Sequence, residues 1–154
     1  MSRRSAGLIM YRTRAGRLEV LLAHPGGPLW AKKDHGAWSI PKGEIADGED
    51  ALDTAKREFE EETGIAASGP FTSLGTIKQK GGKTVEAWAV EGDFDPSSIE
   101  SNSFAMEWPP RSGNIRQFPE IDRAEFFDLD EAQRRINAAQ AELLGKLLEV
   151  ISFD

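Results

Sequence analysis

Three glutamates at helical spacing are the residues of this chain with the clearest chemical meaning. Glu58, Glu61 and Glu62 stand at positions i, i+3 and i+4, so on a helix their carboxylates lie together. Carboxylate oxygens are hard ligands that suit Mg²⁺ or Mn²⁺. The spacing therefore predicts a divalent-cation site, although a solvated helix face is the ordinary explanation for a run of glutamates.

The negative charge of the chain is concentrated around these glutamates. Residues 44–62 contain nine acidic and two basic residues, a net charge of −7 that equals the formal charge of all 154 residues. The other residues balance, with 17 acids (26 less nine) against 17 bases (19 less two). Glu58 and Glu62 are like charges one turn apart, and such a pair costs a helix roughly 0.2–0.5 kcal/mol. A bound cation would remove this repulsion, so the distribution favours a metal site.

The helix that carries the glutamates is predicted from about Glu49 to Thr63. Its buried stripe follows the i, i+3, i+7 pattern and consists of Leu52, Ala55 and Phe59. Gly64 ends the helix, because glycine tolerates positive φ just past the last turn. Before the helix, Pro41 keeps the chain extended as it enters Gly43.

The segment from Gly43 to Ile65 is similar to the Nudix box. Gly43, five residues, Glu49, seven residues and then the run REFEEETGI match the box at each defining position. The resemblance implies the Nudix fold, which is an α+β structure. In this fold a mixed β-sheet forms the middle layer of an α/β/α sandwich. It also implies hydrolysis of a nucleoside diphosphate linked to another group, with Mg²⁺ or Mn²⁺ as the cofactor.

The same resemblance assigns roles to residues of the segment. The metal ligands would be Glu58, Glu61 and Glu62, together with the carbonyl group of Gly43. Arg57 and Glu49 would form an ion pair that orients the helix, so that Glu58, Glu61, Arg57 and Glu49 make up the catalytic set. Family members differ in which glutamate acts as the base, and we expect Glu58 here.

Six residues outside or at the edge of the helix are further candidates. Glu120 precedes the last predicted strand, where several Nudix enzymes place an additional acidic metal ligand. The expected substrate-binding residues are Lys42, Lys78 and Lys83 for phosphate and Trp38 and Trp88 for stacking on a base. Each has an ordinary alternative: a solvated loop carboxylate, a solvated hairpin tip, or core packing.

Short apolar runs predict the rest of a mixed sheet. The expected strands are Ala6–Arg12, Arg17–His24, Phe71–Lys80, Thr84–Glu91 and Ala124–Phe127. Gly81 and Gly82 provide a hairpin turn. Gly92–Phe118, rich in Ser, Asn, Gly and Pro, is expected to be a long functional or mobile loop.

Two helices are predicted to close the chain. The first runs from about Asp130 to Asn137 and is capped by Asp128. The second runs from about Ala139 to Ile151, with a core side formed by Leu143, Leu147 and Val150. Strands on either side of the acidic helix, followed by terminal helices, indicate an α+β fold.

Composition limits the function classes. A chain of 154 residues is expected to form one domain spanning residues 1–154. The absence of cysteine excludes thiolate catalysis and disulfides, and His24 and His35 are expected to be loop or surface residues. The apolar run after the N-terminus is too short for a signal peptide or membrane span, so we expect a cytoplasmic protein. We also expect it to be a monomer or a homodimer. An isoelectric point near 5.0 argues against duplex DNA as a partner.

A softer resemblance bears on the substrate. The residues that carry it are Ala6–Arg12, Trp38, Pro41-Lys42-Gly43, Gly48-Glu49-Asp50 and Lys83-Thr84-Val85 before Trp88. They are similar to the asymmetrical diadenosine tetraphosphate hydrolase branch, which implies cleavage of dinucleoside polyphosphates to products such as AMP and ATP. The insertion Gly92–Phe118 departs from that pattern.

Two other functions compete with this one. The first is a housecleaning Nudix pyrophosphohydrolase for nucleoside triphosphates, nucleotide sugars or RNA 5′ ends. The second is a non-catalytic Nudix domain that binds nucleotides as a sensor. The complete set of Arg57, Glu58, Glu61 and Glu62 weighs against a sensor, because binding alone does not need all of them.

Overall fold

A mixed β-sheet forms the centre of the computed structural model, which describes residues 3–151. Within these residues the sheet has six strands in the order β4-β5-β1-β2-β8, and β3 pairs with β1. The strands are β1 (Arg4–Arg14), β2 (Arg17–Pro25), β3 (Lys42–Glu44), β4 (Phe71–Lys78), β5 (Thr84–Glu91) and β8 (Ile121–Asp128). The pairing of β1 with β5 is parallel, whereas β1–β2, β1–β3, β4–β5 and β2–β8 are antiparallel.

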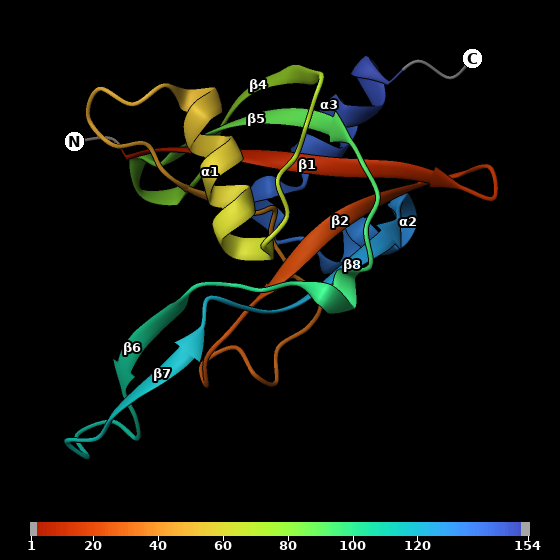
Figure 1. Cartoon of the computed structure of the whole chain (residues 1–154). Helices are drawn as coiled ribbons and strands as arrows, with labels where there is room; N and C mark the ends of the chain where they lie inside the picture. Colours follow the sequence, from red (N-terminus) through yellow and green to blue (C-terminus); the bar gives the residue numbers. More distant parts are fainter. Residues whose placement is uncertain (1–2, 152–154) are drawn as a thin grey trace.

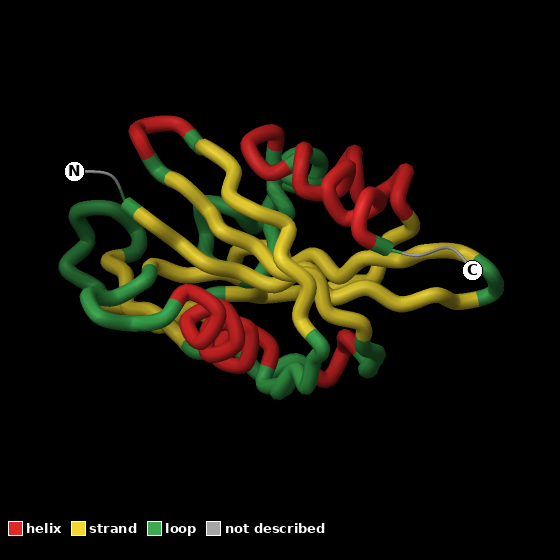
Figure 2. Tube along the Cα trace, turned by 90° about the horizontal axis from the view of Figure 1, so that it is seen from above, coloured by secondary structure: helices red, strands yellow, loops and turns green. Residues whose placement is uncertain are grey.

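Helices cover both faces of this sheet (Figures 1 and 2). They are α1 (Ala51–Thr63) on one face and α2 (Leu129–Arg135) and α3 (Glu142–Val150) on the other. Side chains of β1 alternate between the faces: Leu8 packs in the cluster of Phe59 from α1, and Ile9 in the cluster of Leu147 from α3. Burying such a side chain contributes about 1.5–3 kcal/mol. The predicted α/β/α arrangement is confirmed.

Helix α1 ends where the sequence predicts but begins slightly later. The side chain of Asp50 accepts a hydrogen bond from the backbone N–H of Asp53, which caps the first turn. Gly64 has φ of 79° and donates its backbone N–H to the carbonyl of Glu60 at 2.7 Å. The predicted positive-φ termination is therefore confirmed, and the helix starts two residues later than the prediction.

Tight turns fix the strand pairs. Gly81 and Gly82 both have positive φ, 75° and 76°, in the connection from β4 to β5, as predicted. Ala15 and Gly16 have positive φ in the turn from β1 to β2, which matches the twist of a two-residue hairpin. These turns set the register that aligns β1 with β2 and β4 with β5.

The expectation of an irregular loop over Gly92–Phe118 is wrong in part. The structure forms a hairpin there from β6 (Ser103–Glu107) and β7 (Ile115–Pro119). Figure 1 shows this hairpin projecting away from the main sheet. In β6, the half-buried Phe104 and Met106 alternate with exposed residues, the pattern of a strand with one covered face.

The C-terminal region and β2 each correct one further expectation. Asp128 caps α2 as predicted, by accepting a hydrogen bond from the N–H of Glu131. In α3, Leu143 and Leu147 are buried as expected, but Val150 is 41% exposed and Leu144 is buried instead. His24, expected in a loop or at the surface, lies in β2 and is fully buried. Within residues 3–151, none of the helices combines the length and the apolar character needed to cross a bilayer.

Candidate active site

Strand β3 places Gly43 directly against the acidic face of α1. Gly43 pairs with Ala6 of β1, so its backbone position is set by the sheet. A Cβ atom added to Gly43 would overlap the carboxylate of Glu58. An added side chain at this position would have to displace the Glu58 carboxylate, and the Gly43 backbone and Glu58 therefore share one small site.

Arg57 holds several carboxylates at once. Its Nε and Nη2 donate to the two oxygens of Glu49, each at 3.1 Å, and its Nη1 donates to Glu58 at 3.1 Å and to Glu61 at 3.2 Å. The bidentate pair with Glu49 is charge-assisted and lowers the pKa of Glu49 to about 2. The predicted ion pair between Arg57 and Glu49 is thus present, and Arg57 also orients two of the proposed metal ligands.

Glu62 is a buried carboxylate with an unsatisfied oxygen. It is 7% exposed, and its Oε2 has no hydrogen-bond partner among the described residues. Burial, and then the charge of Glu58, raise the pKa of Glu62 to about 8, while the backbone and charge of Lys42 act in the opposite direction. Leaving a buried acceptor unpaired is costly, so this oxygen has the character of a ligand for a cation.

Glu120 joins the acidic cluster through the main chain. The N–H of Asn102 donates to the carbonyl of Glu61 at 3.0 Å, and the N–H of Glu120 donates to the carbonyl of Asn102 at 2.7 Å. The carbonyl of Glu120 accepts from the N–H of Gly26 at 2.9 Å. This chain of hydrogen bonds ties the base of the β6–β7 hairpin to the last turns of α1.

The side-chain electrostatics agree with this placement. Burial, and then the charge of Glu61, raise the pKa of Glu120. Burial and Glu61 likewise raise the pKa of Glu58, and Glu120 adds to the effect. The four glutamates at positions 58, 61, 62 and 120 therefore form one cluster, which we call the acid cluster.

The acid cluster fits a divalent cation by its chemistry. Within residues 3–151, no three acidic or histidine side chains are already arranged as a complete set of metal ligands. Three observations nevertheless favour a cation such as Mg²⁺, which binds hard oxygen ligands. The Oε2 atom of Glu62 is unsatisfied, Glu58 lies close against Gly43, and the carboxylates repel one another. A cation would satisfy the buried oxygen and offset the repulsion together.

The stacking role expected for Trp38 is wrong. Trp38 is fully buried among core residues on the α3 side of the sheet. Its Nε1 donates to Asp34 at 2.8 Å, and its ring packs edge-on against Phe127 with centroids 5.0 Å apart. A side chain with no exposed surface cannot stack on a ligand, so core packing is the role of Trp38.

The other expected substrate-binding residues keep exposed or half-exposed positions. Trp88 lies half-buried on β5, on the face of the sheet that α1 covers. Lys78 and Lys83 are exposed at the β4–β5 turn, and Lys42 is half-buried on β3 next to the acid cluster. The structure brings Lys42 to the cluster, whereas the roles of Trp88, Lys78 and Lys83 stay predictions.

Sequence reasoning missed the residues that attach the hairpin to the cluster. Asn102 and Gly26 act through their backbone groups, and no side-chain pattern reveals such a role. A usable signal was the pair Gly26-Gly27 just before Trp30, because adjacent glycines often permit close approach of another backbone segment.

Known protein sequences are similar to this chain. The family model of the NUDIX domain matches residues 1–147. An RNA pyrophosphohydrolase of Caulobacter vibrioides is 33% identical over 94 residues, which cover 58% of this chain and 48% of that protein. The asymmetrical bis(5′-nucleosyl)-tetraphosphatase of Rattus norvegicus is 36% identical over 108 residues, covering 62% of this chain and 69% of that protein. The match thus spans about half the length of the Caulobacter relative.

Solved structures with the same fold are more distant in sequence. A C. elegans Ap4A hydrolase binary complex has a TM-score of 0.63 at 24% identity, and covers 96% of each chain. The NUDIX domain of Shewanella oneidensis NrtR, complexed with ADP ribose, has a TM-score of 0.67 at 14% identity, covering 99% of this chain and 90% of the other. At these identities the similarity establishes the fold.

Proposed function

This chain belongs to the NUDIX domain family, and we propose that it is a Mg²⁺-dependent pyrophosphohydrolase that cleaves phosphoanhydride bonds of nucleoside diphosphate derivatives. The observation that carries the proposal is the acid cluster, in which Glu62 has a buried, unsatisfied oxygen and Glu58 lies against Gly43. Nudix hydrolases generally use divalent cations, and the oxygen ligands here suit Mg²⁺ or Mn²⁺.

The residues of the cluster would divide the work as follows. Glu58, Glu61, Glu62 and Glu120, with the carbonyl of Gly43, would hold the cation. A bound Mg²⁺ would neutralise negative charge on the phosphate oxygens. Arg57 keeps Glu49, Glu58 and Glu61 in fixed orientations through its hydrogen bonds. Glu58 would accept a proton from the attacking water on a carboxylate oxygen.

For the substrate we propose dinucleoside polyphosphates, with diadenosine tetraphosphate cleaved to AMP and ATP. The similarity to the rat asymmetrical tetraphosphatase supports this choice. Lys42, near the cluster, and Lys78 and Lys83, at the β4–β5 turn, are proposed to contact the remaining phosphates. Trp88 is proposed as an aromatic contact.

An RNA pyrophosphohydrolase is the second candidate. The Caulobacter relative supports it, and an RNA 5′ end offers the same phosphoanhydride chemistry. The cytoplasmic location, the single-domain organisation and the monomeric or homodimeric state stay predictions from the sequence.

A direct assay tests the proposal. Purified protein is incubated with diadenosine tetraphosphate, nucleoside triphosphates or 5′-triphosphorylated RNA, in Mg²⁺ or in excess EDTA, and products are identified by mass. We expect AMP and ATP from the dinucleotide in Mg²⁺ and no turnover in EDTA. If the products are two ADP molecules, or if RNA ends are strongly preferred, the proposed cleavage of diadenosine tetraphosphate to AMP and ATP is wrong. Another substrate then takes its place. Full turnover in EDTA would overturn the metal-dependent mechanism.

Substitution of Glu58 by Gln provides the residue-level test, because it removes the charge while keeping the side-chain volume. We expect turnover to fall by about 10²-fold or more with the fold retained. Glu60→Gln is the matched control, since Glu60 is an exposed residue of the same helix and lies outside the acid cluster. Equal losses in both variants would mean that the helix acts only as a charged surface.

A further inference from the structure

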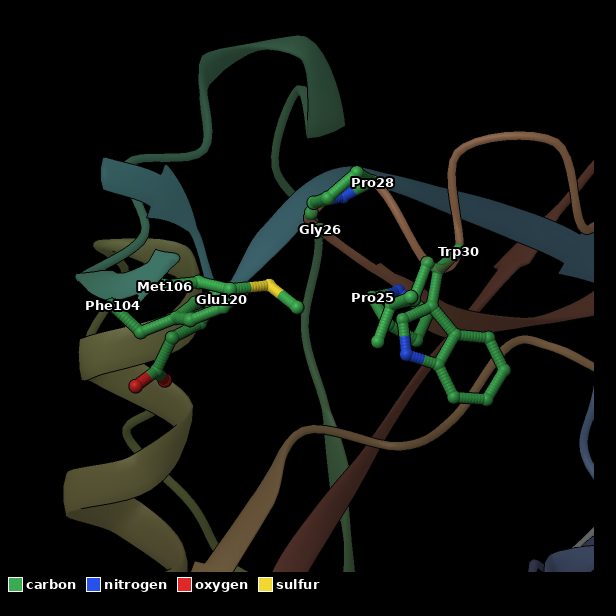
Figure 3. A pocket seen from close by; sticks show the side chains of 9 residues that line it. Pro25, Gly26, Pro28, Trp30, Phe104, Met106 and Glu120 are labelled. Carbon is green, nitrogen blue, oxygen red and sulfur yellow. The ribbon is translucent and has the colours of Figure 1, made fainter. Parts of the chain in front are cut away.

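A pocket next to the acid cluster is lined, apart from Glu120, by residues that the proposed hydrolysis does not use. It has a volume of about 330 Å³ and lies between residues 25–30, which follow β2, and the β6–β7 hairpin. Figure 3 shows Trp30 and Pro25 on one side and Phe104, Met106 and Glu120 on the other. Small-molecule sites commonly measure about 300–1,000 Å³ and combine apolar walls with a few polar groups, so this pocket has the size of a site for one flat ring system.

Two adjacent glycines allow the walls of the pocket to meet. A Cβ atom at Gly26 would overlap the carbonyl of Pro119 at the end of β7. A Cβ atom at Gly27 would lie 2.9 Å from Cζ of Phe104, at a position where φ is already +94°. A side chain at Gly26 would push the loop and the hairpin apart, and one at Gly27 would displace the Phe104 ring and strain the backbone. The pocket is therefore a consequence of specific close packing.

Buried polar contacts hold the loop that carries Trp30. The ring of His24 is fully buried, with Nε2 2.6 Å from the carbonyl of Lys33 and Nδ1 2.8 Å from Oδ1 of Asp122. This arrangement fixes the loop to β8. The Lys33 ammonium in turn lies 5.0 Å from the centroid of the Trp30 ring.

Glu120 belongs to both the pocket and the acid cluster. Its side chain lines the pocket, and its backbone is joined to α1 through Asn102 and to the loop through Gly26. A phosphate bound at the acid cluster would therefore lie next to the pocket. The group attached to that phosphate is the natural occupant of the apolar space.

We propose that this pocket binds a nucleobase of the substrate, with Trp30 and Phe104 as its aromatic contacts and Met106 filling the remaining wall. The proposal rests on the proposed function, because the phosphates of the same molecule are held at the acid cluster. Aromatic side chains bind any nucleobase through its flat face. Trp30 therefore takes the stacking role that the buried Trp38 cannot perform, and the hairpin becomes a determinant of substrate specificity.

The test separates base binding from catalysis. Binding of AMP, GMP, CMP and UMP, which contain no phosphoanhydride bond to cleave, is measured by calorimetry in Mg²⁺ for the wild type and for Trp30→Ala and Phe104→Ala. We expect at least one mononucleotide to bind the wild type and both variants to bind it about tenfold more weakly or worse. In Mg²⁺, KM for diadenosine tetraphosphate should rise by a similar factor while kcat stays within about threefold.

Trp108→Ala is the matched control, because Trp108 is a tryptophan at the hairpin tip that does not line the pocket. Its binding and KM should equal those of the wild type. Trp30 is 40% exposed, so its truncation should leave the fold intact, which circular dichroism can verify.

The outcomes distinguish the two proposals. If the wild type binds none of the four mononucleotides, or if the two pocket variants bind as the wild type does, the base pocket is overturned even where hydrolysis is found. If mononucleotides bind through Trp30 but no phosphoanhydride is cleaved in Mg²⁺, the base pocket stands and the proposed enzyme activity falls.

Discussion

Gly43 and Glu58 are in such close contact that the carboxylate of Glu58 fills the place of a side chain on Gly43. The two residues come from β3 and α1, so the contact joins the sheet to the helix that carries the acid cluster. Any atom added to Gly43 must displace the carboxylate, which makes this contact a sensitive point for substitution.

Gly43→Ala should therefore abolish most activity without unfolding the protein. Displacing a catalytic group by about 1 Å can cost on the order of 10²-fold in rate, and we expect kcat to fall by at least that factor. The clash involves a flexible side chain, so the melting temperature should change by no more than a few degrees. Steady-state kinetics and thermal melts check both parts. A variant with wild-type kcat would show that Glu58 does not need its position against Gly43.

Gly145→Ala should have the opposite profile. Gly145 lies inside α3, where a Cβ atom would meet nothing within 4 Å and φ is not positive. Alanine is favoured over glycine in a helix by about 0.8–1.0 kcal/mol. The free energy of unfolding in urea should rise by up to that amount, with kcat and KM unchanged. A loss of stability would mean that the helix does not persist in solution as described.

Arg57→Lys should lower activity although the charge is kept. A lysine ammonium cannot reproduce the bidentate pair with Glu49 while also contacting Glu58 and Glu61. We expect kcat to fall by about 10²-fold and Glu49→Gln to have a smaller effect, because it leaves the other two contacts. The double variant should lose less than the two single losses combined, since both disturb one network. Full additivity in kcat would argue that Arg57 and Glu49 act separately.

The stability of the metal-free protein should depend on pH through Glu62. Its pKa is raised from 4.5 to about 8 by burial and by Glu58. Because the folded value lies above the unfolded value, the contribution of this group to stability is fully present below pH 4.5 and is lost as pH rises toward about 8. Mg²⁺ requires the ionised carboxylate, so the stabilisation that it gives should grow over the same window.

Thermal melts in EDTA and in Mg²⁺, between about pH 5 and pH 9, measure both effects. Glu62→Gln should flatten the dependence in EDTA across this window and reduce the shift caused by Mg²⁺. A Mg²⁺-induced shift of equal size at both ends of the window, with Glu62 present, would contradict the assignment of Glu62 as a ligand.

Local sequence patterns predicted the parts of the site that lie on one helix. The positive φ of Gly64 and the shared side of Glu58, Glu61 and Glu62 depend on residues within one or two turns. Arg57 and Glu49 are eight residues apart, and their pairing follows once the helix and its preceding turn are formed. Such short-range features need no knowledge of the rest of the fold.

Long-range packing decided the features that the sequence did not reveal. Trp38 pairs through its backbone with Ile136, almost a hundred residues away, and this contact carries its ring to the α3 face. The short strands β6 and β7 were hidden because the residues between them, rich in Pro, Ser and Gly, resemble an irregular segment. Phe104 of β6 lies close to Gly27, and only the folded chain brings these two residues together.

The pairing of β6 with β7 also makes the hairpin a suitable place for protein engineering. The strands pair without interruption from Ser103 with Pro119 to Glu107 with Ile115, and the exposed tip beyond them includes Arg111 and Gly113 in left-handed conformations. The entropy cost of closing a loop grows only slowly with its length. Residues inserted at this tip should therefore cost little stability, and the paired strands still fix the separation of the strand ends. A fluorescent label or a whole reporter domain could be spliced there, and it would follow movements of the hairpin while the acid cluster stays intact.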